Sequence, residues 1–348
     1  MTSLRGLLVR GPLLVFAAVL GVLMVVAGLG LQRYAWRDAS ARVEVHLDHV
    51  ARQLDFRLAE MERLAASIGE AWEDGRVDPA DAAGCWRQLA PWMKPHVHIT
   101  GVNLVRMDGQ GFGLGRIGPE LLGRGVLPDR SGWRFGPTFG AAALPVRRPG
   151  DPEPPGIDFR TRPWFQVGLS AKGATWTDAF AFAVRREGQP GLCLVRPVRA
   201  ADGGLRGVLS LDLVLESLCQ VVWEVRPSPG TRLMVLDGQG RVIVPPSAPG
   251  DRPVPGPEAF LRPVGPAHHP LAHELFTGIR AGGTGTTTFQ AARDGYRGRI
   301  RPLGRGGGPD WFLVLAMPDR DVNADPARRM LVVAAAWAGL VVLFGFLA

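Results

Sequence analysis

Lysine is nearly absent from this 348-residue chain, which contains only Lys94 and Lys172. Almost all of its basic charge is therefore arginine, and the arginines are scattered although the formal net charge is +8. A nucleic-acid-binding surface needs a basic patch or stripe, often on one face of a helix. The charge pattern therefore excludes nucleic acid as a partner.

Cysteine is scarce as well, and Cys85, Cys193 and Cys219 are far apart in the sequence. No C-x-x-C pair occurs, so neither a cysteine zinc site nor a thioredoxin-like redox motif is available. We expect three isolated buried thiols; the alternative is one disulfide with one thiol left over.

Catalytic and cofactor motifs are missing too. His96 and His98 would share one face of a strand, but two imidazoles without a further ligand cluster do not make a metal site. The histidines of 268–274 lack the H-E-x-x-H spacing, and the glycines of 109–115 lack the context of a dinucleotide loop. We therefore predict no catalytic residue, no metal and no cofactor.

Charged residues are absent from two long apolar runs, Leu13–Leu31 and Met330–Leu347. Each run approaches the roughly 20 residues that a bilayer-spanning helix needs. The first is too long for the apolar region of a signal peptide and has a poor cleavage site, so we interpret it as an uncleaved anchor.

These runs predict a cytoplasmic N-terminus at 1–10 and transmembrane helices at 11–32 and 329–348. Residues 33–328 would then lie in the periplasm of a bacterium, with the protein in the inner (cytoplasmic) membrane. Because the chain ends within or just after the second span, we expect a cytoplasmic output domain to be absent from this chain.

A long amphipathic helix is predicted over 38–72, continuous with the first span, and it forms most of a stalk region at 33–94. Its apolar residues recur at steps of three and four, which is the helical period: Val43, Leu47, Val50, Leu54, Leu58, Met61, Leu64 and Ile68. This seam would pack on the rest of the domain, on a second copy, or on both, so a homodimer is expected. A shorter helix, capped near Asp81, would follow.

From residue 96 the sequence pattern is typical of β-strands, and one short sequence segment occurs twice. Val105–Gly111 and Val235–Gly240 both end in Asp-Gly-Gln-Gly, and Asp-Gly is a hairpin turn signal. We therefore predict an α+β fold with two tandem antiparallel-sheet modules, a larger one at 95–226 and a smaller one at 227–328.

The strongest candidate site is the stretch Asp158–Phe165. It places Arg160, Arg162 and Trp164 in one short loop, and arginine's planar fork suits a carboxylate. Asp212 interrupts an apolar strand, and a buried carboxylate needs a partner. Asp212 either pairs an ammonium group or caps a helix beginning near residue 213; the residues alone leave both open.

Taken together, these motifs resemble bacterial double Cache sensor domains, which are PAS-like. The resemblance covers roughly 34–326 and rests on R-P-W-F at 162–165, W-T-D-A-F at 176–180 and G-V-L-S-L-D at 207–212. It implies a small-molecule sensor with the ligand in the membrane-distal module. In amino-acid-binding members of the family, Arg162 and Trp164 would hold a carboxylate and Asp212 an ammonium group.

The chain departs from that family at two aromatic positions. Phe165 and Phe180 stand where hydroxyl-bearing rings would help to hold a carboxylate, so donors are lost. An amino acid is therefore one option, and an amine or an organic acid in a more apolar pocket are others. The alternatives to a chemoreceptor-type sensor are the sensor half of a histidine kinase or diguanylate cyclase, and a dimerisation or docking module without a ligand.

Overall fold

The computed structural model describes most of the chain between Leu4 and Asp321. The described residues are 4–117, 120–129, 132–139, 158–182, 189–224, 228–246, 256–265, 272–274, 276–277, 288–291, 296–304, 308–318 and 320–321.

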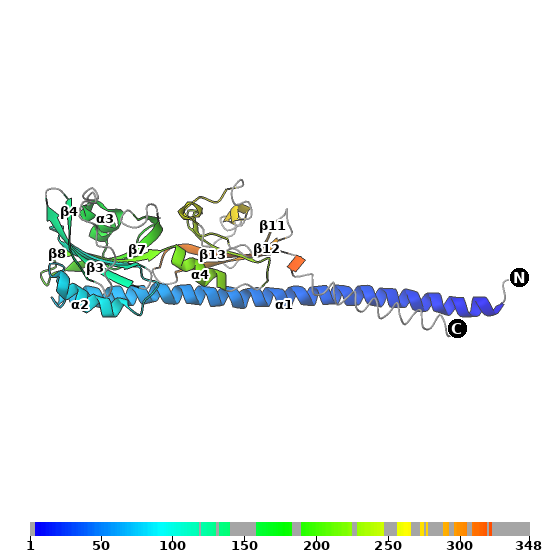
Figure 1. Ribbon diagram of the computed structural model, residues 1–348. Coiled ribbons are helices and arrows are strands. Elements are labelled where there is room, and N and C mark those ends of the chain that lie inside the picture. Colours follow the sequence, from blue (N-terminus) through cyan, green and yellow to red (C-terminus); the bar gives the residue numbers. More distant parts are fainter. Residues whose placement is uncertain are drawn as a thin grey trace.

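One helix, α1 (Leu4–Glu73), runs along the whole molecule, and two sheets lie side by side on it (Figure 1). The helix predicted over 38–72 is confirmed as the second half of α1. All eight residues of the predicted seam are buried, with at most 8% of each exposed. The absence of proline and the steps of three and four keep this face continuous over nine turns.

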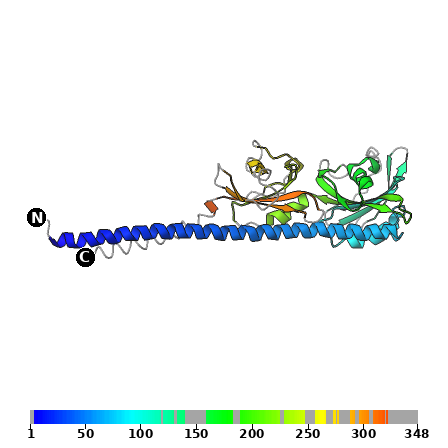
Figure 2. The same cartoon turned by 180° about the vertical axis from the view of Figure 1, so that it is seen from behind.

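The seam packs on the chain's own sheets, above all on β7 and also on β12, β8 and β13. Seen from behind, both sheets still lie on the same side of α1 (Figure 2). A second copy therefore has no access to the seam itself. Alongside the sheets, the residues that α1 turns outward are mostly polar, although Val45 and Phe56 are also exposed.

The N-terminal sheet is antiparallel, with the order β4-β3-β2-β1-β8-β7-β5 and with β6 paired to β7. Its strands are β1 (Gly101–Arg106), β2 (Gly111–Ile117), β3 (Glu120–Asp129), β4 (Gly132–Phe139), β5 (Thr175–Trp176), β6 (Phe180–Ala181), β7 (Pro190–Arg199) and β8 (Leu205–Val214). The helix α2 (Ala82–Met93) begins at Asp81, whose carboxylate accepts a hydrogen bond from the backbone N–H of Gly84, as the predicted cap requires. α2 packs beneath β2 and β3.

The C-terminal sheet is also antiparallel and has the order β10-β9-β13-β12-β11. Its strands are β9 (Arg232–Asp237), β10 (Val242–Val244), β11 (Thr288–Ala291), β12 (Tyr296–Leu303) and β13 (Trp311–Pro318), and α4 (Glu216–Glu224) joins the two sheets. Short 3-10 turns lie at η1 (Phe159–Thr161) and η2 (Pro257–Ala259). The predicted α+β class with antiparallel sheets is confirmed.

The repeated Asp-Gly phrase forms a hairpin in each sheet, but the structural register differs from the sequence register by two residues. The N–H of Gly109 donates to the carbonyl of Arg106, and the N–H of Gly240 donates in the same way to Asp237. Both glycines have positive φ, 90° and 78°, which a residue with a Cβ rarely adopts. Arg106 is therefore equivalent to Asp237, and each residue of β1 has a counterpart in β9.

The C-terminal sheet is fastened to α1 by an acid–base ladder, which we define as the ion pairs Glu44–Arg299 and Asp48–Arg301. Four residues of helix rise about 6 Å and two residues of strand about 6.7 Å, so a helix and a strand running alongside each other keep these pairs in step. The backbone N–H of Gly304 extends the ladder by donating to Asp55 at 3.4 Å.

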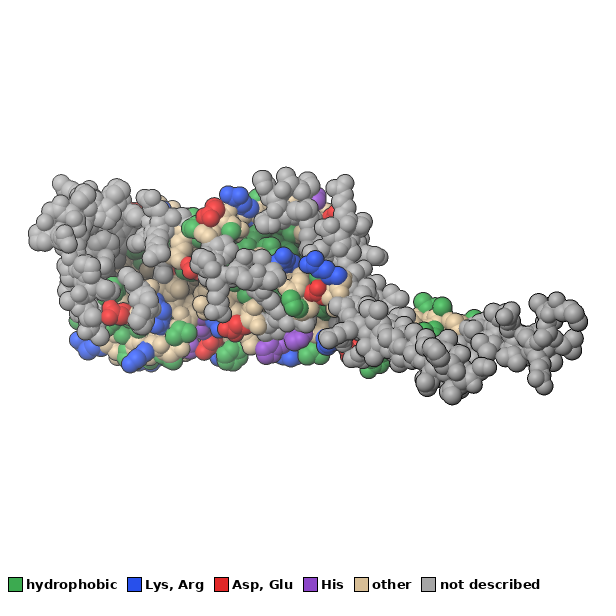
Figure 3. Space-filling view, turned by 45° about the vertical axis from the view of Figure 1, so that its right-hand side comes forward, with side chains coloured by type: hydrophobic (Ala, Val, Ile, Leu, Met, Phe, Trp, Pro, Cys, Tyr) green, Lys and Arg blue, Asp and Glu red, His purple; other side chains and the backbone are tan. Residues whose placement is uncertain are grey.

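Among the residues that the structure describes, no helix has a segment both long enough and apolar enough to cross a bilayer. The second predicted span, 329–348, lies outside the described residues. The first, 11–32, is part of α1, and Figure 3 shows hydrophobic side chains on the portion of α1 that projects beyond the sheets. These exposed residues are Val19, Val22, Leu23, Val25, Val26 and Leu29.

Candidate functional site

The candidate site lies on the face of the N-terminal sheet turned away from α1, where α3 (Pro163–Ser170) packs on β7 and β8 (Figure 1). Pro163 at the first helical position fixes the backbone angle with which α3 begins. Gly168 lets the helix approach the strand closely, because a Cβ there would lie 2.3 Å from the Val208 side chain. Trp164 and Phe165 are buried in the resulting apolar cluster with Cys193 and Val208.

Arg162 is placed between η1 and α3, and the Nε of its side chain is buried without a hydrogen-bond partner. Leaving a buried guanidinium N–H without an acceptor is costly. Arg162 is thus the one arginine of the predicted loop with a buried donor to spare.

Arg160 is already paired. Its guanidinium donates to the Asp158 carboxylate in a forked arrangement, from Nε at 3.0 Å and from Nη2 at 2.8 Å. This contact, chiefly the hydrogen bond, lowers the pKa of Asp158. A ligand carboxylate would have to compete with Asp158 for Arg160.

Asp212 lies within β8 and is only 9% exposed. Its carboxylate accepts hydrogen bonds from Asn103, Ser210 and Cys193, all of them neutral. Among the described residues, no lysine, arginine or histidine forms an ion pair with it. A buried carboxylate held only by neutral donors still lacks a cation.

The helix-capping alternative for Asp212 is wrong. β8 continues to Val214, and α4 begins only at Glu216, so no helix starts next to Asp212. The apolar residues after Asp212 extend the strand through the middle of the sheet, and local capping propensity does not override that pairing. The Asp212 carboxylate instead lies among the side chains of Asn103, Ser210 and Cys193, and we call these four residues the polar group.

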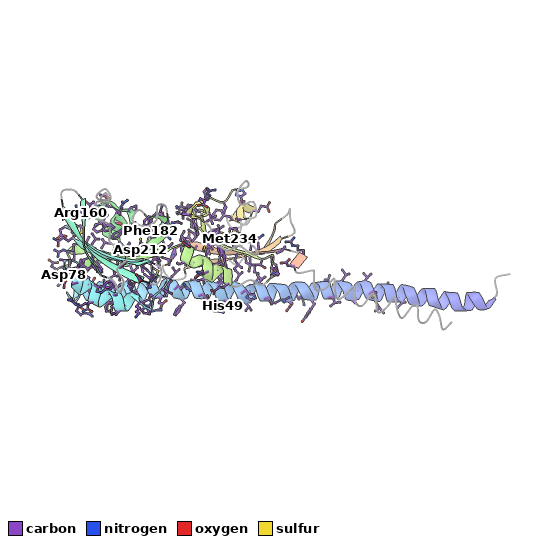
Figure 4. All side chains as sticks on the ribbon, in the orientation of Figure 1. His49, Asp78, Arg160, Phe182, Asp212 and Met234 are labelled. Carbon is purple, nitrogen blue, oxygen red and sulfur yellow. The ribbon has the colours of Figure 1, made fainter. Side chains whose placement is uncertain are left out.

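The two phenylalanines that replace hydroxyl-bearing rings lie in the same apolar cluster as Trp164. Phe165 packs edge to face on Trp164 with ring centroids 5.6 Å apart. Phe180, which is partly exposed, meets Phe182 in the same way at 5.2 Å. Figure 4 labels Phe182, Asp212 and Arg160, which all belong to the N-terminal sheet and the segments packed on it.

Space is left on this face by the glycines of β2. Gly113 and Gly115 pair with Asn103 and Gly101 of β1, and therefore share the face of the Asp212 side chain. A Cβ at Gly115 would meet nothing within 4 Å. The position that a side chain of residue 115 would occupy is therefore open on the face that carries Asp212.

The sequence interpretation missed Asn103, Ser210 and Cys193 as members of the site. For Ser210 a signal existed: it is two residues before Asp212 in a strand, so both side chains must point to the same face. Asn103 and Cys193 come from other strands, and only the pairing of β1 and β7 with β8 brings them to Asp212. Cys85, Cys193 and Cys219 are buried and are not joined by a disulfide.

The prediction that His96 and His98 share one face of a strand is wrong, because β1 begins at Gly101 and residues 96–98 form a turn. The turn nonetheless brings both rings to Glu60 of α1, with His96 Nδ1 3.0 Å and His98 Nε2 3.5 Å from its carboxylate. Burial lowers the pKa of His98 to about 4, although the Glu60 carboxylate opposes this shift. No group of three metal-ligating side chains occurs among the described residues.

Comparison with known proteins places the fold. No family model matches this chain. One curated relative, the methyl-accepting chemotaxis protein McpG of Pseudomonas putida, is 28% identical over 99 residues. The match covers 28% of this chain and spans only 15% of the length of that relative.

Solved structures match over most of the chain. The ligand-binding domain of the Campylobacter jejuni chemoreceptor Tlp3 in complex with 4-methylisoleucine has a TM-score of 0.51 at 12% identity, covering 84% of this chain and 94% of its own. Methyl-accepting chemotaxis protein X has a TM-score of 0.51 at 13% identity, with coverages of 81% and 97%. The Tlp3 domain in complex with L-valine gives 0.50 at 11% identity, with 85% and 97%.

The fold is therefore that of chemoreceptor ligand-binding domains.

Proposed function

We propose that this chain is a sensor domain that binds a small metabolite carrying a cationic nitrogen, a carboxylate, or both. One observation carries the proposal: the face of the N-terminal sheet holds two unmatched groups of opposite charge. They are the buried Nε of Arg162, which lacks an acceptor, and the buried Asp212 carboxylate, which has no cationic partner among the described residues. A ligand that supplies both partners removes both penalties.

The binding residues in this proposal are Arg162 for a carboxylate, Asp212 for an ammonium group, and Trp164, Phe165 and Phe180 for the apolar part. Arg160 contributes only if a ligand displaces it from Asp158. The ligands named for the Tlp3 structures, L-valine and 4-methylisoleucine, are compatible with such a site. Amino acids, amines and carboxylates are therefore the classes to test.

Membrane anchoring also belongs to the proposal. Six large apolar side chains are more than half exposed on the projecting part of α1, between Val19 and Leu29. A contiguous exposed apolar patch indicates contact with a membrane or a partner. With spans at 11–32 and 329–348, the sheet at 95–226 would be membrane-distal and periplasmic, and that at 227–328 membrane-proximal. Flotation of the chain with liposomes tests anchoring; a chain that stays in solution contradicts it.

Signal passage to a cytoplasmic output domain outside this chain, and assembly as a homodimer, complete the proposal. Ligand binding would bias α1 and the second span between two arrangements. Because the seam of α1 is covered by the sheets, a second copy would have to use the outer face around Val45 and Phe56.

The test is calorimetric titration of the full chain in detergent micelles with panels of amino acids, amines and carboxylates. We expect one class to bind and, for a probe that carries a carboxylate, Arg162→Ala to weaken binding by at least tenfold, since a charge-assisted hydrogen bond is lost. Arg199→Ala, an exposed arginine of β7, is the matched control and should leave the affinity unchanged. If no probe binds, the protein is not a sensor of these metabolites, and a docking module is favoured.

A further inference from the structure

The side chain of Asn103 links the other members of the polar group on the N-terminal sheet by hydrogen bonds. Asn103 Nδ2 lies 3.1 Å from Asp212 Oδ2 and 3.3 Å from Oδ1, and it also lies 3.0 Å from Ser210 Oγ. Ser210 in turn donates to Asp212 Oδ1 at 3.2 Å. A single amide group thus reaches both carboxylate oxygens and the hydroxyl beside them.

The two oxygens of Asp212 are not equally occupied. Among the described residues, Oδ1 accepts from Asn103, Ser210 and the Cys193 thiol, whereas Oδ2 accepts from Asn103 alone. An ionised carboxylate has about four lone-pair positions, two on each oxygen. Oδ1 is therefore saturated, and Oδ2 keeps acceptor capacity for a donor from outside the protein.

The position of Asn103 is fixed by the sheet rather than by its own rotamer. It lies in β1 opposite Ser210 of β8 on one side and opposite Gly113 of β2 on the other. A Cβ at Gly113 would lie 3.2 Å from Asn103 Oδ1, so the glycine keeps the place of the amide clear. With its Nδ2 directed at Asp212, the amide holds the carboxylate plane from a rigid strand.

We propose that Asn103 is a positioning residue of the ligand site, which orients Asp212 so that Oδ2 is the acceptor presented to a cationic nitrogen. The site then selects ligands that carry an ammonium group over neutral or purely anionic ones of the same shape. This inference rests on the proposed function, and it narrows the three ligand classes to amines and amino acids.

The chemistry favours a cation over a neutral donor at Oδ2. A neutral hydroxyl would satisfy one lone pair but would leave the buried negative charge uncompensated, whereas an ammonium group does both. A purely anionic ligand would bring a second negative charge close to Asp212. We expect this preference to be about 10- to 100-fold in affinity, the range of a charge-assisted hydrogen bond.

The test measures that preference directly, by calorimetric titration of the full chain in detergent micelles. The probes are L-amino acids and their matched L-2-hydroxy acids, such as L-valine and L-2-hydroxyisovalerate, with alkylamines and simple carboxylates alongside. Each pair differs only in ammonium against hydroxyl. We expect the wild-type chain to bind the ammonium member about 10-fold or more tightly than its partner.

Asn103→Leu removes the amide at similar size and should reduce the ammonium preference about tenfold, with little change for the hydroxy acid. Ser210→Ala, which leaves Oδ2 untouched, should have a smaller effect and serves as the readout if Asn103→Leu fails to fold. Met234→Leu is the matched control, since Met234 occupies the place of Asn103 in the C-terminal sheet. This substitution should leave the affinity for both members of each pair unchanged.

The outcomes separate the two claims. If the chain binds a probe in an Arg162-dependent way but binds both members of each pair equally, or prefers carboxylates without nitrogen, the inference is wrong and the sensor proposal stands. If Asn103→Leu weakens both members equally, Asn103 has only a structural role. If no probe binds the wild-type chain, both proposals fail.

Discussion

The N-terminal and C-terminal sheets share a hairpin and a strand register, yet they place different side chains on the face turned away from α1. Asn103, Ser210 and Asp212 of the first sheet have structural counterparts in the second: Met234, Val314 and Ala316. The three counterparts are all buried and belong to one apolar cluster. At these three positions the C-terminal sheet therefore has no side chain that could pair with a charged ligand.

The difference shows how one scaffold can serve two purposes. The faces turned toward α1 are apolar in both sheets and form one continuous core with the seam of the helix. The outer face of the first sheet carries the buried Asp212, and burying a charge costs stability. Asp237 of the second sheet is buried as well, but it forms an ion pair with Arg241. The proposed site therefore lies on a surface whose polar residues are not explained by packing.

The largest effect is expected from truncating buried side chains of the α1 seam, on which both sheets pack. Ile68→Ala and Leu47→Ala should each lower the free energy of unfolding by about 2–5 kcal/mol, because both side chains are almost fully buried. Leu47 lies beside Glu44 and Asp48 of the acid–base ladder, whereas Ile68 lies near Ala66, whose carbonyl accepts from Arg196 of β7.

Only Ile68→Ala should weaken ligand binding, since it loosens the support of the N-terminal sheet. Thermal unfolding and calorimetric titration of both variants measure the two effects, with Val45→Ala, an exposed position, as the control. Equal losses of affinity would show that the sheets are not energetically separate.

The second prediction removes the charge that distinguishes the two sheets. Asp212→Asn should lower the affinity for an ammonium-bearing ligand by about 100-fold, close to the 3 kcal/mol of a charged hydrogen bond. Ala316→Ser, at the equivalent place in the C-terminal sheet, should leave the affinity unchanged. Titration of the two variants against the same probe makes the comparison. A loss of affinity in Ala316→Ser would indicate that the ligand binds at the C-terminal sheet.

The third prediction concerns how the stability of the fold depends on pH through His98, which lies beside Glu60 of α1. Burial holds the pKa of His98 at about 4 in the folded chain, below its ordinary value of 6.5. The unfolded chain thus binds more protons between these values, so stability is full above about pH 6.5 and falls as the pH drops toward 4. The shift corresponds to at most about 3 kcal/mol.

His98→Gln should flatten the dependence of the melting temperature on pH across this window. His49→Gln, an exposed histidine of α1, should preserve it. A wild-type melting temperature that is level from pH 7 to pH 4.5 would contradict the assignment.

The smallest effect is expected at the acid–base ladder beneath the C-terminal sheet. Arg301→Gln should lower stability by about 1 kcal/mol, and the difference from wild type should shrink in 1 M salt, because partly exposed pairs are screened. Arg52→Gln is the matched control, since Arg52 meets the same Asp48 at 3.9 Å and is far more exposed. Melting curves at two salt concentrations are sufficient; a loss that does not depend on salt would assign Arg301 a packing role.

Much of the fold could be predicted because its signals are periodic. The α1 seam follows the helical repeat, and the apolar strand that Asp212 was predicted to interrupt is β8. The repeated Asp-Gly-Gln-Gly phrase revealed the second sheet, yet its alignment was two residues off, because the turn geometry depends on the positive φ of Gly109 and Gly240 rather than on matching letters.

The site was harder to predict because it is assembled across strands. Arg162, Trp164 and Asp212 were identifiable as unusual residues in their own segments. Asn103 looked like an ordinary polar residue in β1, and only its register opposite Ser210 gives it a role. The pairing of Arg160 with Asp158 was equally invisible, since charge alone does not tell which arginine is already satisfied.

The most direct test of the central claim is the stoichiometry of binding. Calorimetric titration of the full chain with the tightest-binding carboxylate-bearing probe of the panel should give one ligand per chain, and Arg162→Ala should weaken binding at that site at least tenfold. A stoichiometry of two ligands per chain, or a single site that survives Arg162→Ala at full affinity, would contradict the claim that only the N-terminal sheet binds ligand.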